Sequence, residues 1–163
     1  MALVKPVDER FWKINSGFGL RNNPFPPPAQ KMHNGIDLAT PIGSNVYAIE
    51  SGKIIKIGID QRSGLYMIVD HDNNLESRYA HLESFRGSEG DNVNQGQIIA
   101  TTGNTGKITG PHLHYGLRKN GVFVDPARDS LYGVNYFRIF TGIAAGFAIY
   151  KYLIPYLEEK KRS

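Results

Sequence analysis

Short apolar runs bounded by turn-forming residues divide the first 130 positions of the chain. The runs are rich in β-branched and aromatic side chains, and Gly, Asn, Asp or Pro separate them, which is typical of β-strands. Such short strands at close spacing favour antiparallel pairing, so we expect a mainly β domain built on an antiparallel β-sheet. Strands are predicted over residues 46–49, 53–59, 66–69, 76–81, 97–101, 112–118 and 122–124.

Two turns in this pattern have a recognisable chemistry. Asn120-Gly121 lies between two apolar runs and is the preferred pair for a two-residue hairpin turn, so we predict a hairpin there. The segment 69–74 also lies between two apolar runs and predicts a second hairpin tip. It contains His71, which we interpret as a structural or solvated histidine and not as a ligand.

The hydrophobic pattern changes near residue 134. Residues 139–150 carry no charge and are apolar all round, which predicts a C-terminal hydrophobic helix. Aromatic residues at both ends and the snorkelling side chains Arg138 and Lys151 are typical of a membrane anchor, and Gly142-x-x-x-Gly146 offers a face for a helix-helix dimer. The alternative is a helix buried against the domain. We therefore divide the chain into residues 1–133 and a tail, 134–163.

The positive charge of the chain is concentrated in this tail. Residues 1–133 hold 14 Lys and Arg against 13 Asp and Glu, a net of +1, while residues 134–163 hold 5 against 2, a net of +3. The first domain therefore lacks the basic excess of a nucleic-acid-binding protein, and we expect no nucleic-acid partner. The charged end of the tail fits the flank of a membrane helix.

Candidate metal ligands occur in two places. His112 and His114 are two residues apart in a predicted strand, which puts both imidazoles on one face. His33 and Asp37 add a nitrogen and an oxygen ligand upstream. The chain has no cysteine, which excludes a Cys-rich structural site. A His and Asp set with an open position is typical of catalytic zinc.

These residues occur in an order and spacing that resemble the LytM and lysostaphin-type zinc endopeptidases, peptidase family M23. The resemblance covers about residues 14 to 128. The motifs that carry it are Ser16-Gly17-Phe18-Gly19-Leu20-Arg21, His33-x-x-x-Asp37, Pro41-Ile42-Gly43-Ser44-Asn45-Val46-Tyr47-Ala48, Gly52-Lys53-Ile54, Tyr79-Ala80-His81-Leu82, Gly103-Asn104-Thr105-Gly106, His112-x-His114 and Val124-Asp125-Pro126.

The resemblance implies a role for each of these site residues. His33, Asp37 and His114 would bind one zinc ion per chain, while His81 and His112 would be catalytic without binding the metal. Peptide hydrolysis needs a base for water and an acid for the leaving amine, and histidine suits both near neutral pH. Either of the two histidines could be the base; we favour His112 because it lies beside a ligand. The family also implies a barrel-sandwich hybrid-like domain.

The implied activity is a zinc metallo-endopeptidase that cuts the stem peptides or cross-bridges of peptidoglycan, for wall penetration or lysis. The alternative is a catalytically silent protein that binds the wall or a membrane and keeps only the fold. In glycine-cutting members of the family a tyrosine commonly precedes the first histidine. Prolines and Phe25 occupy that neighbourhood here, and we expect this stiff segment, residues 24–28, to form a wall of the cleft.

The location of the chain is a separate prediction. Its first residues contain no apolar stretch of the signal-peptide kind, so we expect no signal peptide, although peptidoglycan lies outside the cytoplasm. A bacteriophage or virus particle that carries the enzyme to the wall would resolve this. We accordingly expect membrane association through residues 134–163, in a virion membrane or another one.

Overall fold

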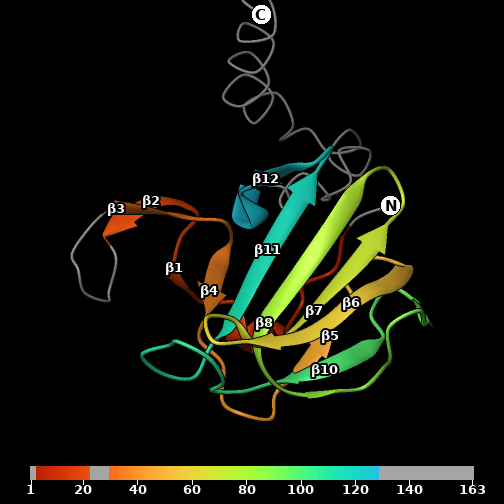
Figure 1. Ribbon diagram of the computed structural model, residues 1–163, viewed down its shortest axis with the longest axis horizontal. Helices are drawn as coiled ribbons and strands as arrows, with labels where there is room; N and C mark the ends of the chain where they lie inside the picture. Colours follow the sequence, from red (N-terminus) through yellow and green to blue (C-terminus); the bar gives the residue numbers. More distant parts are fainter. Residues whose placement is uncertain (1–2, 23–29, 129–163) are drawn as a thin grey trace, which may run out of the picture.

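The strands of this protein form one large antiparallel sheet and one small hairpin. The structure is a computed structural model that describes residues 3–22 and 30–128 of the chain (Figure 1). Its elements are a 3-10 helix, Glu9–Phe11, and the strands β1 (Ile14–Ser16), β2 (Gly19–Asn22), β3 (Gln30–His33), β4 (Ile36–Leu38), β5 (Asn45–Tyr47), β6 (Gly52–Asp60), β7 (Gly64–His71), β8 (Leu75–Phe85), β9 (Asn92–Val93), β10 (Ile98–Thr102), β11 (Leu113–Lys119) and β12 (Val122–Val124).

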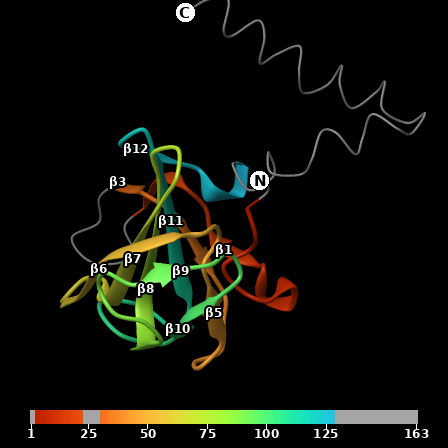
Figure 2. The same cartoon turned by 90° about the vertical axis from the view of Figure 1, so that its right-hand side faces the viewer.

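The large sheet has the strand order β1-β4-β11-β8-β7-β6-β9. Two branches extend it: β12 pairs with β11, and β10 pairs with both β8 and β5. The long strands β6, β7, β8 and β11 lie side by side at its centre (Figure 1), and the view turned by 90° shows the sheet curling (Figure 2). The hairpin β2–β3 forms a second, two-stranded sheet beside it.

Alternating side chains of the central strands form the core. Tyr79 and Tyr115 face each other across β8 and β11, and their rings stack with centroids 5.9 Å apart. Ile54 on β6, Met67 on β7 and Leu117 on β11 are fully buried. Burial of such side chains contributes about 1.5–3 kcal/mol each, so this layer gives the central strands a rigid floor.

All the strands predicted from the hydrophobic pattern are present, with ends shifted by a few residues. They correspond to β5, β6, β7, β8, β10, β11 and β12. The Asn-Gly hairpin is confirmed, because Lys119 pairs with Val122 and both turn residues have positive φ, 50° at Asn120 and 78° at Gly121. The mainly β antiparallel fold is thus confirmed.

The strands of the first 45 residues were not predicted. β1 to β4 are three or four residues long, and β2 and β3 expose Leu20, Lys31 and Met32, so no apolar alternation marks them. The predicted C-terminal helix, the tail 134–163 and the segment 24–28 lie outside the described residues. Within the described ranges, no helix is long and apolar enough to span a membrane.

His71 ends β7 and has a structural environment, as predicted, although it is buried and not solvated. Its Nδ1 donates to the Ser51 carbonyl over 3.0 Å, and its Nε2 lies 2.7 Å from the Ser77 hydroxyl. A carbonyl can only accept, so Nδ1 carries the proton of the neutral ring and Nε2, with its lone pair, lies against the Ser77 hydroxyl. Burial lowers the pKa of His71, which keeps the ring neutral.

Candidate metal centre

Three strands bring one nitrogen or oxygen atom each to a single point. His33 ends β3, Asp37 lies in β4 and His114 lies in β11. β4 and β11 are antiparallel neighbours in which Asp37 and His114 pair directly. The tight turn between β3 and β4 returns His33 to the same place, and a Cβ on Gly35 would lie only 2.5 Å from the Tyr115 carbonyl oxygen. Glycine at position 35 therefore allows the turn to lie against β11.

The three candidate ligand atoms are His33 Nε2, Asp37 Oδ1 and His114 Nδ1. Asp37 Oδ1 lies 3.1 Å from His33 Nε2 and 2.9 Å from His114 Nδ1, and the two nitrogens are 3.0 Å apart. His33 and Asp37 are buried, with only 4 % and 7 % of their surface exposed. Burial alone would raise the pKa of Asp37, but the hydrogen bonds to His114 and His33 outweigh it and hold the carboxyl ionised.

Surrounding groups orient each of these ligands. His33 Nδ1 donates to the Gly17 carbonyl over 2.7 Å, so the Nε2 lone pair faces the centre. Asp37 Oδ2 accepts from Arg21 Nη1 over 3.1 Å, which leaves Oδ1 for the centre. Arg21 is itself held by Ser16 Oγ. Partners of this kind fix ring tautomers and carboxylate orientation in metal sites.

The donor set fits a zinc ion. Two imidazole nitrogens and one carboxylate oxygen are zinc ligands, and three protein ligands leave a coordination position open for chemistry. Burial lowers the pKa of His114, and a neutral imidazole is the form that binds a metal. Among the described residues, His33, Asp37 and His114 are the group whose ligand atoms converge in this way, all within 4.8 Å of one another.

His112 and His81 stand beside this centre. His112 precedes β11, so the strand begins one residue later than predicted, and its Nε2 lies 3.6 Å from Asp37 Oδ1. The His81 and His112 rings meet edge to face with centroids 4.8 Å apart. The Nδ1 of His112 donates to the Gly110 carbonyl over 2.8 Å, and that of His81 donates to the Thr105 carbonyl over 2.9 Å. Each bond leaves Nε2 with the lone pair.

The backbone at His81 is unusual. Its φ of 62° lies in the left-handed region, where a non-glycine residue costs about 1–3 kcal/mol unless the surroundings impose it. Here they do: the His81 N–H donates to the Ser63 carbonyl over 2.8 Å, and its carbonyl accepts from the Gly103 N–H over 2.9 Å. Burial lowers the pKa of His81 to about 4, so its ring is neutral at physiological pH.

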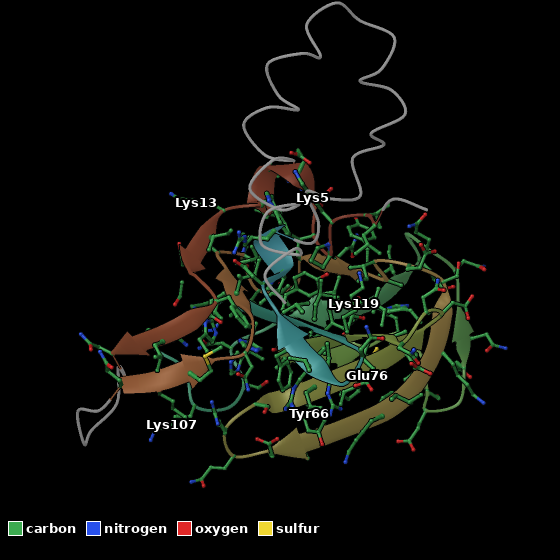
Figure 3. The ribbon with its side chains drawn as sticks, turned by 90° about the horizontal axis from the view of Figure 1, so that it is seen from above. Lys5, Lys13, Tyr66, Glu76, Lys107 and Lys119 are labelled. Carbon is green, nitrogen blue, oxygen red and sulfur yellow. The ribbon has the colours of Figure 1, made fainter. Side chains whose placement is uncertain are left out.

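A cleft of about 460 Å³ opens over the five site residues. The hairpin β2–β3 contributes Arg21, Lys31 and Met32 to its lining, and the segments 60–63 and 107–109 also line it. In Figure 3, Lys107 lies toward the hairpin and Tyr66 over the central sheet.

The structure brings His33, Asp37, His81, His112 and His114 together as the sequence predicted, from three separate parts of the chain. Two residues that support them were not predicted as site residues. Arg21 occurs in a motif already singled out, but its contact with Asp37 spans 16 residues. Thr105 also occurs in a motif already singled out, but its backbone oxygen contacts His81 across 24 residues of sequence.

Comparison with known proteins finds the same family that the sequence motifs resemble. The profile described as Peptidase family M23 matches residues 31–126. The chain is 39 % identical over 110 residues to the peptidoglycan DD-endopeptidase ShyB of Vibrio cholerae, covering 68 % of this chain and 26 % of ShyB. The chain thus spans about a quarter of the length of that relative.

Two solved structures resemble this one closely. A zinc-containing peptidase from Vibrio cholerae superposes with a TM-score of 0.72 at 38 % identity, over 77 % of this chain and 39 % of that one. The catalytic domain of the antimicrobial peptidase lysostaphin from Staphylococcus simulans superposes with a TM-score of 0.65 at 31 % identity, over 73 % of this chain and 92 % of that domain. The latter overlap covers nearly a whole catalytic domain.

Proposed function

The chain belongs to peptidase family M23, and from that premise we propose that it is a zinc metallo-endopeptidase that hydrolyses peptide bonds in bacterial peptidoglycan. One observation carries the proposal: His33, Asp37 and His114 converge on one point in a cleft, and His81 and His112 lie beside them. A purely structural zinc site would be closed by a fourth protein ligand.

His33 Nε2, Asp37 Oδ1 and His114 Nδ1 would hold the metal, one ion per chain. Bound there, zinc supplies a Lewis acid for the scissile carbonyl and lowers the pKa of coordinated water to about 7. Arg21 binds Asp37 Oδ2, so Oδ1 is the carboxylate oxygen that would bind the metal. The Gly17 carbonyl binds His33 Nδ1 and in the same way leaves Nε2 for the metal.

His81 and His112 handle the protons of the reaction. Each ring donates from Nδ1 to a backbone carbonyl, so each has a basic Nε2 available in the cleft. One accepts a proton from the attacking water at Nε2 and, as the imidazolium so formed, passes that proton to the nitrogen of the leaving amine. The other stands beside the reacting centre and stabilises the transition state. General acid and base catalysis of this kind contributes typically about 10²- to 10⁴-fold. The closeness of His112 to Asp37 supports His112 as the base.

The assignment of peptidoglycan rests on relatives. ShyB is named a peptidoglycan DD-endopeptidase, and a DD-carboxypeptidase/endopeptidase of Neisseria meningitidis is 40 % identical over 74 % of this chain. The bond that is cut lies in a stem peptide or a cross-bridge. Digestion of whole walls of several chemotypes, followed by mass analysis of the fragments, identifies that bond.

The deciding experiment incubates the purified protein with peptidoglycan, with and without a zinc chelator, and measures newly freed amino groups. The proposal expects amino groups to appear, to stop with the chelator and to return when zinc is restored. Cleavage that resists the chelator, or no cleavage on any wall chemotype, would contradict it.

A catalytically silent protein with the same fold is the alternative that this experiment must exclude. Such a protein would bind walls without releasing amino groups, and replacing His81 would change nothing. We expect the variant His81→Ala to lose activity and still bind zinc. His81 packs against the candidate ligand His114 through its ring, with centroids 6.2 Å apart, and is not one of the three ligands.

We also propose that residues 134–163 attach the protein to a membrane, as part of a phage or virus particle or of a cell. The uncharged run 139–150 with its aromatic ends supports this, and Gly142 and Gly146 supply a face for a helix-helix dimer. The full chain should partition into detergent, and a chain ending at residue 130 should not. Equal partitioning would contradict the anchor, and an unchanged oligomer in Gly142→Ile would contradict the dimer.

A further inference from the structure

The walls of the cleft carry more positive than negative charge. Arg21, Lys31, Arg62, Arg78 and Lys107 line the cleft, against Asp37 and Asp60. Both acids already have partners. Asp37 belongs to the metal centre, and Asp60 Oδ1 accepts from the backbone N–H groups of Arg62 and Ser63 over 2.8 and 2.6 Å. A cleft of this charge favours a substrate that brings its own negative groups.

Among these cations, Arg78 lies on a central strand of the large sheet. It lies in β8, two residues before Ala80, which pairs directly with the ligand His114. The residue opposite Arg78 on β11 is Gly116, so no side chain stands beside it on that strand. Two residues of a strand span about 7 Å, which places Arg78 one or two substrate residues from the metal centre. Its charge is among those that lower the pKa of His114.

The side chain of Arg78 is fixed in place. Its Nη2 donates to Ser63 Oγ over 2.9 Å, and its guanidinium lies 4.9 Å from the centre of the Tyr66 ring. Tyr66 comes from β7, the neighbour of β8, and is labelled in Figure 3. A guanidinium held on both sides loses little conformational freedom when it binds a ligand.

Arg78 makes no salt bridge within the part of the chain that the structure describes, although its charge is among the causes that lower the pKa of Asp60. No carboxylate oxygen of those residues lies within 4.0 Å of it, although it is half-buried. The nearby Glu76, on the same strand, instead faces Arg118 at 3.5 Å. A guanidinium has five N–H donors, and the bond to Ser63 uses one. A preorganised arginine with N–H donors to spare in a substrate cleft can bind a carboxylate.

We propose that Arg78 binds a free carboxylate of the peptide substrate, on a residue within about two positions of the scissile bond. This inference rests on the proposed function and deepens it: the substrate is a peptide cross-link that carries free carboxylates, in contrast to a neutral glycine bridge. A fork of guanidinium N–H donors matches a carboxylate in two parallel hydrogen bonds. Arg78 therefore sets specificity and is not part of the proton transfer.

The test compares two synthetic D,D-cross-linked stem-peptide dimers that differ only in their side-branch carboxylates, free in one and converted to carboxamides in the other. The zinc-loaded full chain should cleave the free form with a kcat/KM about 10- to 100-fold higher, the range of a hydrogen bond to a charged group. In Arg78→Gln the ratio should fall to about 1, and in Arg78→Lys it should be intermediate because lysine keeps the charge without the fork.

Both dimers are measured with the same protein, so a substitution that only lowers the amount of folded protein leaves the ratio of their kcat/KM values unchanged. Arg118→Gln is the matched control, because Arg118 is exposed, pairs with Glu76 and does not line the cleft, and it should leave the ratio unchanged. A ratio near 1 in the unaltered chain, or an undiminished ratio in Arg78→Gln, would overturn the inference while the proposed function stands.

A binding measurement separates the two proposals further. The full chain with His81→Ala is expected to bind the dimers without cleaving them, so their affinities report recognition alone. The free form should bind about 10-fold or more tightly than the amidated form, and Arg78→Gln added to this variant should remove the difference. If the unaltered chain cleaves neither dimer, the proposed function fails; if the affinities are also equal, the carboxylate receptor fails with it.

Discussion

The ring of His81 donates a hydrogen bond of 2.9 Å from Nδ1 to the backbone carbonyl of Thr105, and this bond sets which nitrogen faces the cleft. The side chain of Thr105 in turn holds the loop in place. Its hydroxyl accepts from the Leu65 N–H over 3.0 Å and donates to the Leu82 carbonyl over 2.7 Å. Thr105 thus ties the ends of β7 and β8 to the loop that positions the histidine.

Thr105→Val should therefore reduce catalysis without reducing zinc content. Valine has nearly the same shape but makes neither hydrogen bond, so the loop carbonyl loses its fixed position. We expect kcat to fall about 10- to 100-fold, the cost typical of a displaced catalytic group. The free energy of unfolding should fall by about 1–3 kcal/mol. Kinetics and metal analysis of the purified variant measure both effects.

Thr105→Ser is the control for that prediction, because serine keeps the hydroxyl. It should retain most of the activity. The nitrogen-15 shifts of the His81 ring provide a separate readout: Nδ1 should carry the proton in the unaltered chain and in the serine variant. A valine variant with unchanged ring shifts and unchanged kcat would show that Thr105 does not position His81.

The Arg21–Asp37 contact predicts an effect on metal affinity. Arg21 Nη1 lies 3.1 Å from Asp37 Oδ2, and without it the carboxylate is free to rotate away from the single-oxygen arrangement. Arg21→Met should weaken zinc binding by about 10- to 100-fold, as typically follows the loss of a group that orients a ligand. Competition with a chromogenic chelator measures the affinity directly.

Arg10→Met provides the comparison for Arg21, since Arg10 is exposed and pairs loosely with Asp8 at 3.8 Å. Its zinc affinity should match that of the unaltered chain. Equal affinities in the two variants would mean that Asp37 needs no support from Arg21.

Zinc should also stabilise the fold. The ligands come from β3, β4 and β11, so the ion joins the hairpin β2–β3 to the large sheet. A ligand that binds only the folded state adds RT ln(1 + [L]/Kd), about 2.7 kcal/mol when the free zinc is 100 times Kd. Thermal unfolding with and without chelator measures the shift. In Asp37→Ala the shift should largely vanish, and its persistence would place the metal elsewhere.

The sequence predicted those parts of the molecule that depend on local patterns. Apolar alternation marks β6 to β8 because one face of each strand packs on the core, and Asn120-Gly121 marks a turn because its backbone needs positive φ. The His-x-His spacing indicated a shared location for His112 and His114, although only His114 lies in β11. In each case the determining interaction spans few residues.

The remaining features depend on contacts between distant segments. β2 and β3 are held by pairing with each other and by the metal-site residues, and their exposed side chains show no alternation. The left-handed backbone of His81 is imposed by Ser63 and Gly103, which lie 18 and 22 positions away in sequence. Arg78 is recognisable as a receptor only once the positions of every carboxylate around it are known.

His71 gives the fold a dependence on pH that is separate from the metal centre. Burial lowers its pKa below the ordinary 6.5, although Glu50 and Asp70 act in the opposite direction. Well above its ordinary pKa of 6.5 the ring is neutral in the folded and unfolded chain alike. As the pH falls through 6.5, the unfolded chain takes up the proton first, so the free energy of unfolding decreases. The decrease ends once the pH is below the lowered pKa of the folded state.

His71→Asn removes this titrating group, so the free energy of unfolding should depend less strongly on pH. Denaturant unfolding at about pH 7.5 and about pH 5.5, on either side of the histidine range, gives the loss of stability for each protein. The variant should be less stable at the higher pH, because the bonds to Ser51 and Ser77 are weakened, but should lose less on acidification. Contributions from the metal-site histidines are common to both proteins and cancel in the difference. An equal loss in both would mean that the folded chain accommodates a charged ring at His71, against the burial seen there.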